Sequence, residues 1–151
     1  MPDLLYERQF NGPVIGIDEV GRGPWAGPVT ATAIWLCPSC YDDLPADIED
    51  SKKITPARRS ILASYLMALP HRYCTVSIDV KTIDEIGILQ ATFAGMVGAA
   101  KGLCDQFSNA QLPNPVHALI DGNLLPPDLP LPATAVVKGD GRSLSIAAAS
   151  I

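Results

Sequence analysis

Short apolar runs alternate with polar and proline-rich segments along the chain. Five runs rich in β-branched and aliphatic residues predict strands: residues 14–17, 29–36, 72–80, 116–120 and 133–138. Between them, apolar side chains recur at helical spacing in residues 56–69 and 88–107. The pattern predicts an α/β fold. We find no internal repeat and no linker, and we expect a single domain over residues 1–151.

The helix boundaries can be predicted from capping residues. Thr55 followed by Pro56 is typical of a helix start, and Pro70 ends that helix. Residues 143–151 also begin like a helix, with serines followed by alanines, but the sequence ends after two turns. We therefore expect a domain that is incomplete at its C-terminus. Its last apolar side chains would then lack packing partners and be exposed: Ile146, Ala149 and Ile151.

Composition narrows the class of protein. The 151 residues are 48% hydrophobic and 18% charged, which excludes a disordered chain and suits one domain with its own core. The net charge of −5 excludes a generic electrostatic binder of duplex nucleic acid, but leaves room for a local basic stripe or for metal ions. The N-terminus is not a signal peptide and no apolar run reaches the roughly 18 residues of a transmembrane helix. We expect a cytoplasmic protein with no membrane association.

Two of the four cysteines, Cys37 and Cys40, have C-x-x-C spacing. This spacing leaves open a redox pair or half of a zinc site. No second C-x-x-C and no paired histidines follow to complete four zinc ligands. The pattern therefore favours ordinary free thiols in a loop and core.

Acidic residues end two of the predicted strands. Asp18 and Glu19 follow residues 14–17, and Asp121 follows residues 116–120. If these strands are neighbours, the three carboxylates converge. Two ionised carboxylates at ~4 Å repel by about 4 kcal/mol at an effective dielectric constant of ~20, so such a cluster needs protonation or a cation. Oxygen ligands without histidine or cysteine favour Mg²⁺ or Mn²⁺. For Asp18 and Glu19 to share one site, we expect the chain to leave β geometry there, helped by the following glycines.

Residues 21–26 also fit the G-x-G-x-x-[GA] pattern of dinucleotide-binding proteins. That pattern requires a helix directly after the glycines, whereas Pro24 and Pro28 interrupt this segment and a β-rich run follows. The sequence contains no P-loop motif. Nucleotide binding of either kind is therefore excluded.

Six segments, in order, resemble the motifs of the type 2 ribonuclease H family, ribonuclease HII. They are GIDEVGRGPWAGPV (16–29), DSKKIT (50–55), ID with ILQAT (83–84 and 88–92), IDGN (120–123), VKGD (137–140) and SIAAASI (145–151). The resemblance covers the chain from about residue 14 onward. It implies a ribonuclease H-like mixed β-sheet flanked by helices.

The resemblance also implies a function. The family cuts RNA in RNA–DNA hybrids, and cuts at single ribonucleotides in duplex DNA, by two-metal-ion hydrolysis with Mg²⁺ or Mn²⁺. Asp18, Glu19 and Asp121 would be three of its four metal-binding and catalytic carboxylates, and we expect the fourth after Ile151. The backbone around two glycines would approach the ribose 2′-OH and basic side chains would contact phosphates. The expected substrate-binding residues are Gly21, Arg22, Gly23, Lys52, Lys53, Lys138 and Arg142.

The sequence leaves three functions open. The leading hypothesis is an endoribonuclease of this family, acting as a monomer on hybrid or ribonucleotide-containing duplex. The alternative is a catalytically impaired, hybrid-binding remnant that lacks the fourth carboxylate. An unrelated Mg²⁺-dependent phosphotransfer enzyme that shares the sheet is a third, remote hypothesis.

Overall fold

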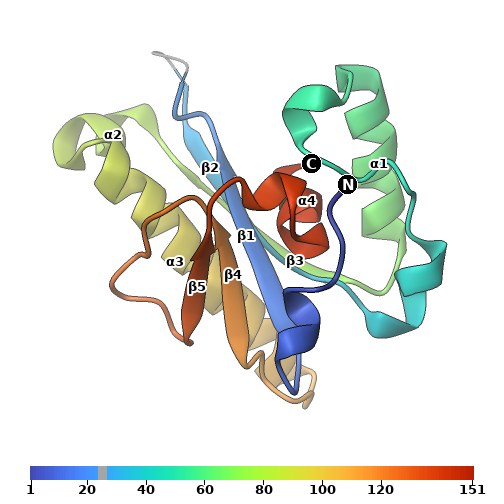
Figure 1. Cartoon of the computed structure of the whole chain (residues 1–151). Coiled ribbons are helices and arrows are strands. Elements are labelled where there is room, and N and C mark those ends of the chain that lie inside the picture. The colour runs from blue at the N-terminus through green and yellow to red at the C-terminus, as the bar shows by residue number, and fades with distance from the viewer. Residues whose placement is uncertain (24–26) are drawn as a thin grey trace.

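The computed structural model describes residues 1–23 and 27–151, and there the chain forms a sheet with helices on both faces (Figure 1). Five strands and four α-helices follow one another: β1 (Val14–Val20), β2 (Val29–Trp35), α1 (Pro56–Ala68), β3 (Arg72–Ile78), α2 (Val80–Ile86), α3 (Ile88–Asn109), β4 (His117–Asp121), β5 (Ala133–Val136) and α4 (Leu144–Ser150). Four short 3₁₀ turns accompany them: η1 (Glu7–Gln9), η2 (Pro38–Asp43), η3 (Ser51–Lys53) and η4 (Gly139–Gly141).

The sheet is mixed, with the strand order β3-β2-β1-β4-β5. β1 pairs antiparallel with β2, and β2 pairs antiparallel with β3. On the other side of β1, β4 and β5 run parallel to it. β1 is therefore the central strand, and its neighbours come from residues far apart in the sequence. The predicted mixed sheet flanked by helices is confirmed.

Alternate side chains of β1 enter two separate cores. Ile15 and Ile17 pack with the apolar stripe of α3, which covers one face of the sheet. Val14 lies on the other face, where it packs with Leu119 of β4 and Ile146 of α4. Because side chains alternate along a strand, Asp18 belongs to the α4 face and Glu19 to the α3 face.

Gly16 allows α4 to pack directly on the central strand. A Cβ atom built at Gly16 would lie 2.2 Å from the carbonyl carbon of Ser145, which no real structure tolerates. The helix backbone therefore contacts the strand two residues before Asp18. This close approach brings the N-terminal turn of α4 next to the acidic end of β1.

The expected elements are confirmed with shifts at their ends, and two expectations were wrong. β1 continues through Val20, so Asp18 and Glu19 lie inside the strand instead of following it. Ile146 and Ala149 are buried rather than exposed, because α4 packs against β1 and β2 and joins a core with α1. Ile151 is partly buried against that core. Residues 24–26 of the first family motif lie outside the described residues.

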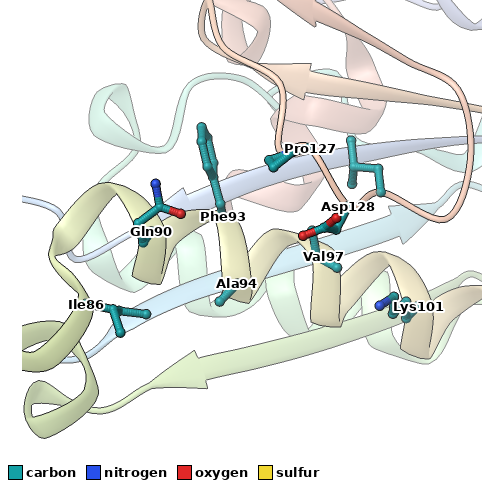
Figure 2. Close-up of a pocket in the computed structure, with 9 residues that line it drawn as sticks. Ile86, Gln90, Phe93, Ala94, Val97, Lys101, Pro127 and Asp128 are labelled. Carbon is teal, nitrogen blue, oxygen red and sulfur yellow. The ribbon is translucent and has the colours of Figure 1, made fainter.

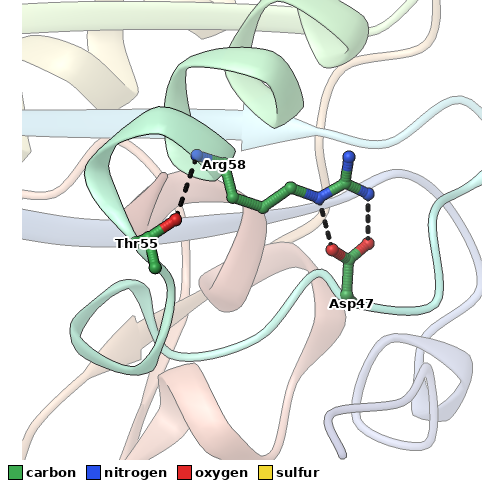
Figure 3. A network of polar contacts seen from close by, with 3 residues as sticks. All are labelled: Asp47, Thr55 and Arg58. Carbon is green, nitrogen blue, oxygen red and sulfur yellow. Dashed lines mark hydrogen bonds and ion pairs between the residues drawn. The ribbon is translucent and has the colours of Figure 1, made fainter.

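The start of α1 agrees with the prediction from Thr55 and Pro56. The Thr55 Oγ1 accepts a hydrogen bond from the Arg58 backbone N–H at 3.3 Å. The Arg58 guanidinium forms two hydrogen bonds with Asp47, from Nε at 2.6 Å and from Nη2 at 2.9 Å (Figure 3). This fork joins the preceding loop to the first turn of α1.

In the described part of the chain, no single helix is long and apolar enough to cross a membrane. α2 and α3 reach that length and composition only as a pair that is bent by 120°. The cysteines, including Cys37 and Cys40, are free thiols.

Candidate active site

The register of β1 and β4 brings Asp18 and Asp121 together. Gly16 pairs with Leu119 and Ile17 with Ile120, so Asp18 and Asp121 follow at the same level of neighbouring parallel strands. Both side chains lie on the face that α4 covers. Their carboxylate oxygens lie within 4.8 Å of each other, which confirms the predicted convergence of these two acids.

A third carboxylate, Asp140, completes this group. One oxygen from each of Asp18, Asp121 and Asp140 lies within 4.8 Å of the other two. Asp140 belongs to η4, which follows β5. The Gly139 backbone N–H donates to Asp121 Oδ1 at 2.6 Å and so ties the turn to β4. We call Asp18, Asp121 and Asp140 the aspartate cluster.

Asp140 was missed as a site residue by the sequence reasoning, although its motif was noticed. Asp18, Asp140 and Glu19 all lie near Asp121, so the described residues bring four carboxylates together. A fourth carboxylate therefore need not come from beyond Ile151, because the turn after β5 returns to the strand ends; a metal-binding carboxylate after Ile151 stays a prediction. The available signal was a third aspartate after a predicted strand, in VKGD.

Burial and the neighbouring carboxylates raise the pKa of two members of the aspartate cluster, Asp18 and Asp140. Burial, and then the charge of Asp121, raise the pKa of Asp18 from 3.8 to about 8. The pKa of Asp140 is raised by burial and by the charges of Asp121 and Asp50. Asp18 and Asp140 are 7% and 8% exposed, so water screens them little. Such a group needs protons or a cation, and its all-oxygen donor set suits Mg²⁺ or Mn²⁺.

Glu19 approaches Asp121 from the other face of the sheet. It is not part of the aspartate cluster, and it lines a small cavity of about 170 Å³ with Asp121, Arg22 and residues of α3. The Arg22 guanidinium lies 3.8 Å from the Glu19 carboxylate. Burial raises the pKa of Glu19, although Arg22 partly offsets this. The predicted departure from β geometry was wrong, because Asp121 at the end of β4 is within reach of both faces.

Four of the expected substrate-binding residues line one cavity beside the aspartate cluster. This cavity has a volume of about 850 Å³, and Asp121 and Asp140 form part of its wall. Its basic lining residues are Lys52, Lys53, Lys138 and Arg142. Lys53 also pairs with Glu49 at 3.8 Å. The structure thus collects basic side chains from η3 and from the turn around η4 in one place, despite the negative charge of the chain.

The two expected glycines have different structural roles. Gly21 has a φ of +101°, and a Cβ atom there would lie 2.2 Å from the Pro28 carbonyl oxygen. Gly21 is therefore required by the turn itself. Gly23 has no heavy atom within 4 Å of an added Cβ, so nothing in the described chain demands a glycine there.

A groove that the sequence did not predict lies along α3. It has a volume of about 850 Å³ and runs between α3 and the loop that carries Pro127 and Asp128. Figure 2 shows Phe93 and Gln90 projecting from α3 beside this groove. Phe93 also lines the small cavity that contains Glu19 and Asp121. The groove therefore leads away from the carboxylates along the helix.

The mixed sheet flanked by helices is a ribonuclease H-like fold, which solved structures share. A mutant protein of Bst-RNase HIII superposes with a TM-score of 0.79 at 20% identity, covering 99% of this chain and 53% of that one. The ribonuclease H2 of Pyrococcus horikoshii gives a TM-score of 0.68 at 23% identity, covering 92% of this chain and 69% of that one.

Sequence comparison identifies the family within this class. The profile described as Ribonuclease HII matches residues 15–151, so the chain belongs to the ribonuclease HII family. It is 51% identical to the ribonuclease HII of Jannaschia sp. over 99% of this chain and 69% of that protein. It is also 51% identical to that of Rhodospirillum rubrum, over 100% of this chain and 66% of the relative. A Ruegeria relative, 50% identical, is matched over 62% of its length. This membership excludes an unrelated phosphotransfer enzyme.

Proposed function

We propose that the chain is a metal-dependent endoribonuclease. It would hydrolyse the RNA strand of RNA–DNA hybrids and cut at ribonucleotides embedded in duplex DNA. One observation carries this proposal: three aspartate oxygens lie within 4.8 Å of one another, and two of these aspartates, Asp121 and Asp140, line a cavity together with four basic side chains. The acids can hold a cation where the basic side chains can hold a phosphate backbone.

The carboxylates fit Mn²⁺ or Mg²⁺. Asp18, Asp121 and Asp140 offer hard oxygen ligands, and Glu19 adds a fourth carboxylate on the far side of Asp121. The raised pKa of Asp18 reflects burial and the charge of Asp121, and a bound cation would offset both. A solved Bst-RNase HIII of the same fold, with a TM-score of 0.76, is described in complex with Mn²⁺. When bound, paired divalent ions supply an activated water and neutralise charge on the leaving oxygen.

The remaining residues would hold the duplex and select the ribonucleotide. Lys52, Lys53, Lys138 and Arg142 would contact phosphates, which positions a duplex without reading its sequence. The open surface at Gly23 would let the backbone approach the 2′-OH, the group that distinguishes RNA from DNA. We also infer that the protein acts as a monomer in the cytoplasm.

The test is cleavage of a labelled DNA duplex that carries one ribonucleotide, with Mn²⁺ or Mg²⁺. We expect the Asp140→Asn variant to lose at least a hundredfold in rate, because losing one charge-stabilising group costs ~10²–10³. The matched control is Asp128→Asn, which changes a carboxylate outside the aspartate cluster and should keep the wild-type rate.

The same assay distinguishes the proposed endoribonuclease from the alternative, a hybrid-binding protein that does not cut. A wild-type chain that binds the ribonucleotide-containing duplex in Mn²⁺ but never cuts it would be a hybrid-binding remnant. Cutting that is equally fast in wild type and Asp140→Asn would contradict the role of Asp140 while leaving the family's activity intact.

A further inference from the structure

Glu7 is a buried carboxylate that the proposed reaction does not use. It is 7% exposed and lies in η1, before the first strand. Its Oε1 accepts three hydrogen bonds: from Ser143 Oγ at 2.6 Å, Ser145 Oγ at 2.6 Å and the Ser145 backbone N–H at 3.0 Å. Its Oε2 is buried and has no hydrogen-bond partner in the part of the chain that the structure describes. Burying a carboxylate is costly, so its retention here calls for a reason.

The three donors belong to the N-terminal turn of α4, directly after the turn that carries Asp140. Ser143 is the N-cap of α4, and its Oγ accepts from the Ile146 backbone N–H at 3.2 Å. The Ser143 N–H in turn donates to the Gly139 carbonyl at 2.8 Å. Glu7 is therefore connected through Ser143 to the residue that directly precedes Asp140.

The rest of the N-terminal segment holds the same turn. The Leu144 N–H donates to the Asp3 carbonyl at 2.8 Å, and the Asp3 N–H donates to the Arg142 carbonyl at 3.3 Å. The Arg142 guanidinium lies 5.2 Å from the centre of the Tyr6 ring. The residues before β1 thus hold residues 142–145 in place through backbone hydrogen bonds, the contacts of Glu7 and the Tyr6 ring.

The turn needs such a restraint because its geometry is strained and its charge is repelled. Lys138 has a φ of +53°, which is unusual for a residue other than glycine. Asp140 lies within 4.8 Å of two other carboxylates, which repel it when all are ionised. Loss of a restraint on residues 142–145 would let Asp140 move away from Asp18 and Asp121.

We propose that Glu7 is a positioning residue that fixes the turn carrying Asp140 and thereby sets the affinity of the aspartate cluster for a divalent cation. The inference rests on the proposed function, since it assumes that the aspartate cluster holds the ion. Glu7 acts through Ser143 and Ser145 and touches neither the substrate nor the ion. It links an N-terminal turn, 136 residues away from Ser143 along the chain, to the metal site.

The test is the dissociation constant of Mn²⁺, measured by electron paramagnetic resonance of the free ion well below the unfolding temperature. Five proteins are compared: wild type, Glu7→Ala, Ser145→Ala, Asp140→Asn and Leu62→Ala. Leu62, buried in the core between α1 and α4, is the control for a loss of stability remote from the turn. We expect Glu7→Ala to weaken Mn²⁺ binding at least fivefold and Ser145→Ala to weaken it two- to threefold. The Mn²⁺ dissociation constant of Leu62→Ala should stay within twofold of the wild-type value, even if its melting temperature falls as far as that of Glu7→Ala.

The outcomes are distinguishable. Wild-type Mn²⁺ affinity in folded Glu7→Ala and Ser145→Ala, beside weakened binding in Asp140→Asn, would overturn the positioning role alone. Equal weakening in Leu62→Ala would also overturn it, because any loss of stability would then have the same effect. Unchanged affinity in Asp140→Asn would overturn the metal site and this inference together. If Glu7→Ala fails to fold, Ser145→Ala, which removes a single hydroxyl, decides the matter.

Discussion

Replacing Asp18 by asparagine measures how much the ionised Asp18 carboxylate destabilises the fold. In the metal-free protein the pKa of Asp18 is about 8, against 3.8 ordinarily, because of burial and the charge of Asp121. Between these two pH values the folded state keeps a proton that the unfolded state has released. The free energy of unfolding therefore falls as the pH rises from about 4 to about 8, and stays low above that. Asparagine does not titrate, so the free energy of unfolding of the variant should lack this decrease with pH.

The magnitude follows from the pKa. Each pKa unit corresponds to about 1.4 kcal/mol, so ionised Asp18 destabilises the fold by at most about 6 kcal/mol. Movement of Asp140 and entry of water reduce this, and we expect about 3 kcal/mol at pH 9. Asparagine keeps the local hydrogen bond, because its Oδ1 can accept the Glu19 N–H that now lies 2.7 Å from Asp18 Oδ1. At pH 5 the two proteins should have similar stability.

The assay is urea unfolding at pH 5, 7 and 9 in EDTA, and again in Mn²⁺. In EDTA at pH 9 the Asp18→Asn variant should unfold at higher urea than wild type. Mn²⁺ should stabilise wild type, since a ligand that binds only the folded state raises the free energy of unfolding, and should stabilise the variant much less. Asp84→Asn, in α2 and outside the aspartate cluster, is the control and should follow wild type throughout. A variant that is less stable than wild type at pH 9 in EDTA would refute the reasoning.

Three further changes test the packing of α4, the reading of ribose and the phosphate contacts. Gly16→Ala should lower the melting temperature sharply, because the added Cβ would lie 2.2 Å from the α4 backbone. Gly27→Ala is the control and should be tolerated, because a Cβ at Gly27 would have no described heavy atom within 4 Å. Thermal unfolding monitored by circular dichroism compares the two variants. Gly23→Val should fold normally yet cut ribonucleotide-containing duplex much more slowly, with little change in binding to all-DNA duplex; equal losses in both assays would indicate misfolding. Lys138→Gln should weaken duplex binding and reduce the slope of log K against log salt by about 1, whereas exposed Lys81→Gln should leave that slope unchanged.

The hydrophobic pattern was sufficient to predict the central strands of the sheet, because their side chains are almost completely buried. Ile15 and Ile17 are fully buried, and so is Ile120 on the neighbouring strand, so their β-branched runs stand out in the sequence. α2 was not predicted because its seven residues bury no side chain completely. It is defined by its ends, where Asp79 Oδ1 accepts from the Thr82 N–H at 2.8 Å and Gly87 has a φ of +85°.

The candidate site was predictable only where it follows from neighbouring strands. Asp18 and Asp121 could be paired because two strands each carry an acid at one end. Asp140 also follows a predicted strand, but its approach to the other two depends on β5 lying beside β4 and on the left-handed backbone at Lys138, which the hydrophobic pattern does not show. The position of Glu19 on the opposite face follows from strand alternation, once β1 is known to continue through Val20.

The same few residues determine both the packing of α4 and the geometry of the aspartate cluster. Gly16 lets the α4 backbone contact β1, and two residues further along the same face of that strand Asp18 is buried beside the turn that precedes the helix. A side chain at position 16 would push α4 away, and with it Ser143 and the turn that carries Asp140. Glu7 holds the same helix start from the opposite side. The fold can therefore tolerate repulsion among the three carboxylates of the aspartate cluster. The backbone that carries them is fixed by the close packing of α4 on Gly16 and by the buried hydrogen bonds between Glu7 and the start of α4.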